Sequence, residues 1–405
     1  MTSDATPLAT PLATPLATPL DRGLFPVTQR YVYLNHAAVA PLATPARAAM
    51  ERHLAEVTEH GARGWRGWLA AIEAVRAQAA ALVGAAADEM ALMKNTSEGL
   101  AAIAQAIDWR PGDRVVGFEC EFPANIYPWL ALRRRGVVVE LLPESALLNL
   151  EQVRKACAST GADGRGARLL AVSLVQYLSG LRADVDALGV ICRETGTWLV
   201  VDGIQGLGAV PLDVKRAGIH ACAADGHKWL TGPEGAGFLF VDAALLDQLT
   251  PAEVGWFSVD QWEDFAAARR VADSGQPPPW RAGAARFECG SLNTCGVIGL
   301  GAAMGVLAGA GIDQITGHLL TLGDRLAAGL REQGCELLRP SEAPQRRSGI
   351  TSFRHPRSAA DAVVAHLEAR NILCSSRNGW VRCSPHGYNT PDEIDALLAA
   401  VRQLG

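Results

Sequence analysis

The sequence has 405 residues, of which 49% are hydrophobic and 20% are charged, so the chain can bury a sizeable core over about two or three domains. Its formal net charge is −5, and the Lys and Arg residues form no basic stripe, which argues against nucleic acid as a partner. Nine scattered cysteines form no CxxC pair, which disfavours a bound metal and favours reduced thiols. Neither a membrane-spanning apolar run nor a signal peptide is evident. We therefore expect a cytoplasmic globular protein that binds small molecules.

The N-terminal segment is of low complexity, because residues 5–20 repeat the unit ATPL. Proline at every fourth position prevents a helix or a central strand. We therefore expect residues 1–22 to form a disordered or polyproline-like tail. Residues 23–50 are expected to form an N-terminal segment that packs on a smaller C-terminal domain.

The remaining sequence alternates between strand-like and helix-like segments. Apolar, β-branched runs occur at residues 114–119, 137–142, 169–175, 198–202 and 237–241. Strands that alternate with helices predict an α/β fold with a mostly parallel sheet, covered by helices on both faces. We assign this large domain to residues 51–290. Longer helices and short strands then predict a smaller α+β domain over residues 291–405.

A possible anion site follows the segment "EMALMK". Asn95 can cap a helix, and Glu98 follows it by three residues as in a capping box. Thr96 and Ser97 then lie at a helix N-terminus, where free N–H groups and the helix dipole favour a phosphate. An ordinary helix cap is the alternative. The sequence contains no GK[ST] element, which disfavours a Walker-type nucleotide loop.

Two further strands end in residues that can carry chemistry. The strand "WLVVD" ends at Asp202. A buried carboxylate at this position needs a cation, and a protonated pyridine nitrogen is one such cation. The alternative is that Asp202 caps a helix. Gln205 follows in the same loop. The segment "IHACAA" is followed by Asp225, Gly226, His227 and Lys228. Taken alone, Lys228 would be expected at the surface.

A phosphate cup, a strand-end aspartate and a lysine are together the three attachments that pyridoxal phosphate needs. The chain here resembles the class V aminotransferase family, which includes cysteine desulfurases, isopenicillin N epimerase and kynureninase. The resemblance runs from about Tyr31 to the C-terminus in seven ordered motifs: YLNHAAVAP, KNTSEGL, FECEFPANIYPW, VDGIQGLG, DGHKWLTGPEGAGFL, RFECGSLNT and VRCSPHGYNT. It implies a fold type I enzyme with a seven-stranded type of sheet that acts on an L-amino acid.

The resemblance also implies roles for individual residues. Lys228 would form the internal aldimine and then act as the base at Cα, while Asp202 would keep the pyridine nitrogen protonated and Gln205 would bind the ring hydroxyl. Arg382 would bind the substrate carboxylate, which suits a bidentate guanidinium. The phosphate would contact Thr96, Ser97, His227 and, from the neighbouring subunit, Ser291. That last contact implies a homodimer with shared active sites.

Three positions depart from the family pattern. Phe122 stands where desulfurases carry a histidine over the cofactor ring, so it can stack but cannot move a proton. Tyr177 stands in place of an asparagine, so the contact with the ring hydroxyl is altered or shifted to Gln176. Asp225 replaces a Ser or Thr and would repel a phosphate unless it turns away or bonds His227.

Two residues are candidates for the substrate pocket. Trp256 lies in a segment that the family directs towards the active site, where it would line a pocket for a bulky side chain. His36 lies near the family's substrate entrance, with helix capping as an equal alternative.

The reaction class is less constrained. Desulfurases carry a thiolate on a loop before the carboxylate-binding arginine, whereas Cys374 and Cys383 lie inside apparent strands and the segment between them is only turn-sized. This disfavours a persulfide-forming desulfurase. We expect elimination at Cβ, as in a C–S lyase or a kynureninase-like lyase. The alternatives are an aminotransferase, an amino-acid epimerase and a non-catalytic cofactor-binding protein.

Overall fold

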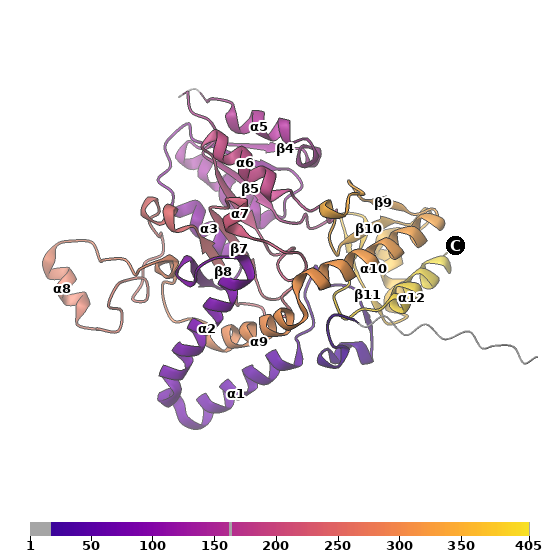
Figure 1. Ribbon diagram of the computed structural model, residues 1–405, viewed down its shortest axis with the longest axis horizontal. Coiled ribbons are helices and arrows are strands. Elements are labelled where there is room, and N and C mark those ends of the chain that lie inside the picture. Colours follow the sequence, from indigo (N-terminus) through magenta and orange to yellow (C-terminus); the bar gives the residue numbers. More distant parts are fainter. Residues whose placement is uncertain (1–17, 162–163, 405) are drawn as a thin grey trace, which may run out of the picture.

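A computed structural model describes residues 18–161 and 164–404 (Figure 1). Its centre is a seven-stranded sheet in the order β2-β8-β7-β6-β5-β3-β4, in which β8 runs antiparallel to both neighbours and the other pairs are parallel. The strands are β2 (Met90–Met93), β3 (Arg114–Phe118), β4 (Val138–Leu142), β5 (Leu169–Ser173), β6 (Trp198–Asp202), β7 (Ala221–Asp225) and β8 (Gly237–Val241). The predicted α/β fold with a mostly parallel sheet is confirmed.

Both faces of this sheet are covered, because alternate residues of each strand enter different hydrophobic cores. In β5, Leu170 and Val172 belong to one core, while Leu169 and Ala171 belong to the other. A strand that is buried on both faces favours a continuous apolar run over polar alternation. The helices of this part of the chain are α1 (Thr44–His60), α2 (Trp65–Val83), α3 (Thr96–Ala106), α4 (Tyr127–Ala131), α5 (Leu150–Ala158), α6 (Val185–Thr195), α7 (Val214–Ala217) and α8 (Ala267–Ser274).

A third core lies under a four-stranded antiparallel sheet in the order β12-β13-β10-β9. A short parallel pair, β1 with β11, joins the N-terminal segment to this part of the molecule. The elements are β1 (Val32–Tyr33), β9 (Glu336–Leu338), β10 (Thr351–Arg354), β11 (Ile372–Leu373), β12 (Ser375–Arg377), β13 (Trp380–Cys383), α9 (Thr294–Ala310), α10 (Ile312–Glu332), α11 (Ala360–Glu368) and α12 (Pro391–Arg402).

A core of the central sheet and the core under the four-stranded sheet meet along α10, beyond the boundary expected near residue 291. Helix α9 packs on α1 and α2, and its Val297 and Leu300 belong to the large core. Along α10, Ile315 and Leu319 still belong to the large core, whereas Leu322 already belongs to the small one. The sequence change near residue 300 marks longer helices, but the first of them completes the large core.

Most of the predicted tail falls on residues 1–17, outside the described residues. At its end, however, Leu20 is buried and its N–H donates to the carbonyl oxygen of Gly387 at 3.1 Å. Ordered structure therefore begins before residue 23. Among the described residues, no single helix is long and apolar enough to cross a bilayer; only α9 and α10 reach that length and composition together, across a bend of 77°.

Candidate active site

A cavity of about 320 Å³ lies where the parallel strands β6 and β7 end. Open α/β sheets bind ligands at this edge, and a volume of this size suits a cofactor or a small substrate. The loops after both strands, the N-terminus of α3 and the strands β12 and β13 contribute to its wall. The residues with polar or aromatic side chains that line it are Asn95, Thr96, Ser97, Phe122, Tyr177, Asp202, Gln205, Asp225, His227, Lys228, Arg377 and Arg382.

Lys228 is one of four lysines in the sequence and the only buried one. Burial lowers the pKa of its amine to about 8, although the carboxylate of Asp202 acts in the opposite direction. Burial also raises the pKa of Asp202 to about 7, against a hydrogen bond of 3.0 Å from the N–H of Ile204 and the charge of Lys228. The loss of hydration therefore outweighs the mutual attraction of the two charges. A neutral, nucleophilic amine is accessible near neutral pH.

The N-terminus of α3 is built as the sequence predicts, with one difference. Asn95 caps the helix, since its Oδ1 accepts the N–H of Glu98 at 2.9 Å, but the Glu98 carboxylate accepts the N–H of Lys94 at 2.5 Å and not that of Asn95. The hydroxyl of Thr96 is buried and has no hydrogen-bond partner among the described residues. An unsatisfied hydroxyl beside free helical N–H groups fits a bound phosphate.

Asp225 faces His227, one of the two arrangements expected for a carboxylate beside the phosphate site. Its Oδ2 lies 3.0 Å from Nδ1 of His227, and both residues line the cavity. The other carboxylate oxygen, Oδ1, is buried without a partner. A carboxylate oxygen directed at the imidazole is the arrangement that limits its repulsion of a nearby phosphate.

Gln205 lines the cavity, but both ends of its amide are engaged. Its Nε2 donates to the carbonyl oxygen of Ala37 at 3.0 Å, and its Oε1 accepts Nε1–H of Trp229 at 2.9 Å. A side-chain amide has a second N–H to donate. The predicted contact with a ring hydroxyl would therefore use that remaining donor.

Arg382 is a buried cation without an anionic partner among the described residues. It lies on β13 and is 2% exposed; Nη1 donates to the carbonyl oxygen of Tyr177 at 2.8 Å, while Nε has no partner. Burial, and then the charge of Arg377, lower its pKa to about 10. A buried guanidinium with free N–H groups fits a carboxylate from the substrate.

Glu121 is a structural residue of the site that the sequence analysis missed. This buried carboxylate accepts the N–H of Ser173 at 2.8 Å, Nε2–H of Gln176 at 2.7 Å and Nδ2–H of Asn125 at 3.0 Å. It thereby fixes the turn that presents Phe122 to the cavity. Nε2 of Gln176 is engaged in this network, whereas its buried Oε1 has no partner among the described residues, and Gln176 does not line the cavity. Glu121 lies beyond the end of β3 and close to Glu119, so no feature of the sequence alone sets it apart.

Three predicted site residues lie elsewhere in the described chain. His36 is fully buried, with Nε2 2.8 Å from the hydroxyl of Tyr388 and Nδ1 2.8 Å from the carbonyl oxygen of Ser384, and it does not line the cavity. Both ring nitrogens are therefore engaged inside the protein. Ser291 is exposed outside the cavity. Trp256 is 40% exposed and also lies outside it.

The comparisons with known proteins agree with this geometry. The aminotransferase class-V family matches residues 32–397. A probable cysteine desulfurase of Methanothermobacter thermautotrophicus is 29% identical over 94% of this chain and 96% of its own, and an uncharacterised aminotransferase of Bacillus subtilis is 28% identical over 92% and 94%. The solved structure of a cysteine desulfurase from Thermococcus onnurineus has a TM-score of 0.84 at 25% identity, covering 95% of this chain and 96% of its own.

The fold and the site define a fold type I, pyridoxal-phosphate-dependent enzyme. The chain belongs to the aminotransferase class-V family. The residues of the cavity fit the cofactor: a lysine amine, a carboxylate that lacks a strong cationic partner, and an unsatisfied threonine hydroxyl at a helix N-terminus. They also fit a substrate amino acid, through the unpaired Arg382.

Proposed function

We propose that the enzyme catalyses an elimination at Cβ of an L-amino acid whose leaving group is attached through sulfur. The observation that carries this proposal is the composition of the cavity. It brings an amine with a lowered pKa, Lys228, together with the unpaired Arg382, while no cysteine lines it among the described residues. These are the groups that an elimination needs, and the group that a persulfide-forming reaction needs is missing.

Each residue has a defined task in this proposal. Arg382 binds the α-carboxylate, and Asp202 holds the protonated pyridine nitrogen. When bound, pyridoxal phosphate withdraws electrons from Cα. Neutral Lys228 removes the proton from Cα, and the bond between Cβ and sulfur then breaks with both electrons leaving on sulfur. Thr96 and His227 hold the phosphate during these steps.

The proton transfers narrow the choice between reactions. After the phosphate and pyridine contacts are assigned, Lys228 and Tyr177 are the lining residues left to move a proton, because Phe122 cannot. An epimerase needs an acid and a base on opposite faces of Cα, whereas an elimination needs one base and a route for protonating the leaving group. This favours elimination over epimerisation.

The segment before Arg382 argues against a persulfide intermediate on the enzyme. Strands β12 and β13 are joined by the two-residue turn Asn378-Gly379, which leaves no loop to carry a thiol. Cys374 and Cys383 are buried, and a hydrogen bond with Cys374, and then burial, raise the pKa of Cys383 well above its usual value. Burial keeps both side chains from reaching a substrate sulfur.

The relatives support chemistry at sulfur. Several are named cysteine desulfurase, a name that denotes the release of sulfur from cysteine, which favours a C–S bond over the C–C bond of a kynureninase-like reaction. Another is named an aminotransferase, so transamination is the second candidate reaction.

The proposal is tested by following products from L-cysteine, L-cystine, S-alkyl-L-cysteines and L-kynurenine. We expect pyruvate and ammonia from the sulfur compounds, with the same yield in the Cys374→Ala variant, because no enzyme thiol accepts sulfur. Alanine with a protein-bound persulfide would instead show a desulfurase. Stoichiometric pyridoxamine phosphate would show a transaminase.

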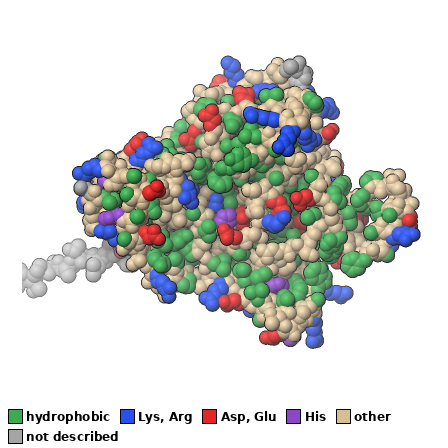
Figure 2. All heavy atoms as spheres, turned by 180° about the vertical axis from the view of Figure 1, so that it is seen from behind, with side chains coloured by type: hydrophobic (Ala, Val, Ile, Leu, Met, Phe, Trp, Pro, Cys, Tyr) green, Lys and Arg blue, Asp and Glu red, His purple; other side chains and the backbone are tan. Residues whose placement is uncertain are grey.

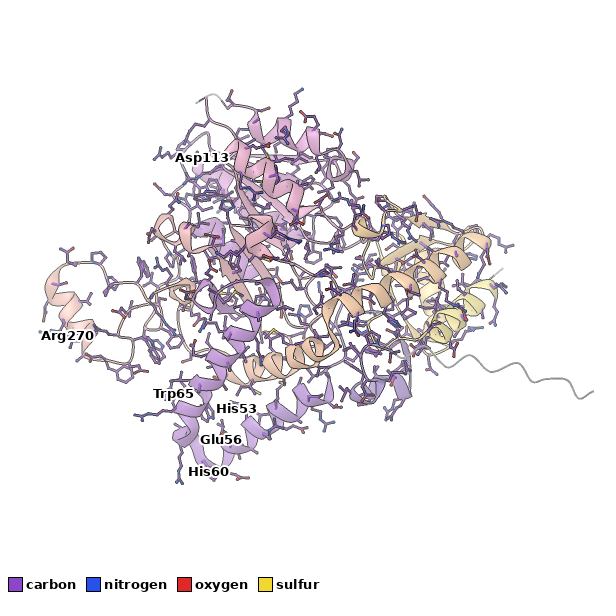
Figure 3. All side chains as sticks on the ribbon, viewed as in Figure 1. His53, Glu56, His60, Trp65, Asp113 and Arg270 are labelled. Carbon is purple, nitrogen blue, oxygen red and sulfur yellow. The ribbon has the colours of Figure 1, made fainter. Side chains whose placement is uncertain are left out.

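We further propose a homodimer in the cytoplasm, where its nine free cysteines would stay reduced. Two projecting elements are available for pairing: the hairpin of α1 and α2, whose tip carries the labelled His60 and Trp65, and the arm that carries α8 and the labelled Arg270 (Figure 3). Phe265 on this arm is 84% exposed, and Figure 2 shows hydrophobic side chains along the arm. Pairing would bury such groups and could bring Ser291 to the partner's phosphate.

A further inference from the structure

A second arginine lines the cavity, and neither the cofactor nor the α-carboxylate requires it. Arg377 lies at the end of β12, opposite Trp380 on β13, and shares the cavity wall with Lys228 and Arg382. Its place is set by the turn at Asn378 and Gly379, whose φ angles of 50° and 76° close the hairpin. The sequence analysis did not identify it, because a charged residue beside a turn usually marks a solvated edge.

The turn that carries Arg377 is anchored on both sides. Asn378 donates Nδ2–H to the hydroxyl of Tyr177 at 3.1 Å. Arg354 donates Nε–H to the carbonyl oxygen of Gly379 at 3.2 Å, and its guanidinium lies 4.0 Å from the ring centroid of Trp380. The backbone of Arg377 is therefore held at the cavity by contacts from two different segments, which favours a defined binding geometry.

The guanidinium of Arg377 has no anionic partner among residues 18–161 and 164–404. Arg377 is exposed, and its Nη1 donates to the carbonyl oxygen of the adjacent Ser376 at 2.8 Å. The acids that line the cavity are otherwise engaged, Asp225 with His227 and Asp202 with the N–H of Ile204. Arg377 also lowers the pKa of Arg382, second to burial. Two neighbouring cations without an acid between them favour an anionic ligand.

The anions expected in the cavity are fewer than its cationic and polar binding groups. The cofactor phosphate is assigned to Thr96, Ser97 and His227, and the substrate α-carboxylate to Arg382. Arg377 is then left without a ligand. We propose that Arg377 binds an anionic oxyacid group on the substrate side chain, so that the preferred substrate is an L-amino acid with a negative charge beyond Cβ. This inference rests on the proposed function, because it takes Arg382 as the α-carboxylate site.

The test uses two amino acids of nearly the same shape, S-carboxymethyl-L-cysteine and S-carbamoylmethyl-L-cysteine, which differ in the charge of the side chain. Their dissociation constants for the holoenzyme are measured from the absorbance change on mixing, before turnover. We expect the carboxylate to bind about fivefold more tightly, the upper range for a partly exposed ion pair. In Arg377→Gln the ratio of the two constants should fall to about one, whereas Arg377→Lys should keep part of it.

A charge reversal provides the matched control. In Arg377→Glu the preference should move to S-(2-aminoethyl)-L-cysteine, whose side chain is cationic. A wild-type ratio near one would overturn the proposal, and so would an equal loss of affinity for both compounds in Arg377→Gln, since that result would place Arg377 on the α-carboxylate.

Binding and reaction are read separately in this experiment. If the charge preference is present but no pyruvate forms, the elimination reaction fails and the assignment of Arg377 stands. If pyruvate forms without a charge preference, the assignment of Arg377 fails and the elimination reaction stands.

Discussion

Two opposing effects act on the pKa of Lys228: burial lowers it and the carboxylate of Asp202 raises it. The effect of burial is the larger one. Because its pKa is lowered to about 8, the amine is protonated below that pH and becomes a nucleophile above it. The rate at which the cofactor-free protein takes up pyridoxal phosphate should therefore rise between about pH 7 and 9 and then level off. The absorbance of lysine-bound cofactor at about 420 nm follows this rate.

The matched variant for this profile is Asp202→Asn. Removing the carboxylate removes the charge that raises the pKa of Lys228, so the midpoint of the profile should move to lower pH. A rate that does not change between pH 6.5 and 9.5, or a midpoint that moves upwards in Asp202→Asn, would contradict the assignment of Lys228 as the reacting amine.

A second prediction at the scale of single residues concerns substrate binding by Arg382. Its guanidinium is 2% exposed and lacks an acid among the described residues, so a bound carboxylate would form a desolvated ion pair. We expect Arg382→Gln to weaken amino-acid binding on the order of 100-fold, since such pairs are worth several kcal/mol. The control ligand is cysteamine, which lacks the carboxylate. An equal loss of affinity for cysteamine would show that the substitution damages the cavity in general.

At the scale of elements, the β12–β13 hairpin depends on a glycine. Gly379 has φ of 76°, and a Cβ there would meet Nη2 of Arg354 at 3.8 Å, so substitution costs backbone strain and causes no clash. Gly379→Ala should lower the free energy of unfolding by about 1 kcal/mol in urea denaturation. The control is Gly67→Ala within α2, which has nothing within 4 Å and should stabilise by up to about 1 kcal/mol. Equal effects of both would contradict this account.

The elements differ in how far the sequence predicts them. The segments at residues 114–119, 169–175, 198–202 and 237–241 all contain strands of the central sheet, because continuous apolar runs follow directly from burial on both faces. The position of the domain boundary is harder to predict, because α9 is apolar on all sides and nothing in its own sequence tells which core it joins.

The residues of the site also differ in how far the sequence predicts them. Lys228, Asp202, Thr96 and Arg382 could be predicted, since their motifs occur in order and the structure brings them to one cavity. Arg377 and Glu121 could not. What distinguishes Arg377 is the lack of an acid around it. What distinguishes Glu121 is that Ser173 and Gln176, from one distant segment, and the nearby Asn125 all donate to it. Both are properties of tertiary packing.

At the scale of the molecule, the shared active site can be tested by mixing two inactive variants. If Ser291 acts across the interface, a mixed dimer of Lys228→Ala and Ser291→Asp contains one site with Lys228 from one chain and an intact Ser291 from the other. Refolded mixtures should regain about one quarter of the wild-type activity, since half the dimers are mixed and each has one complete site. Light scattering should give about twice the chain mass of 42.8 kDa. Activity no greater than that of the separate variants would place Ser291 outside the site.

The central claim is that Lys228 and its cavity perform the chemistry, and the small number of lysines allows a direct measurement. The protein is incubated with pyridoxal phosphate, reduced with borohydride, digested and analysed by mass spectrometry. We predict one modified peptide, which contains Lys228, and none in Lys228→Ala. Modification of the exposed Lys94, Lys155 or Lys215 in preference to Lys228, or an unmodified wild-type protein, would contradict the account.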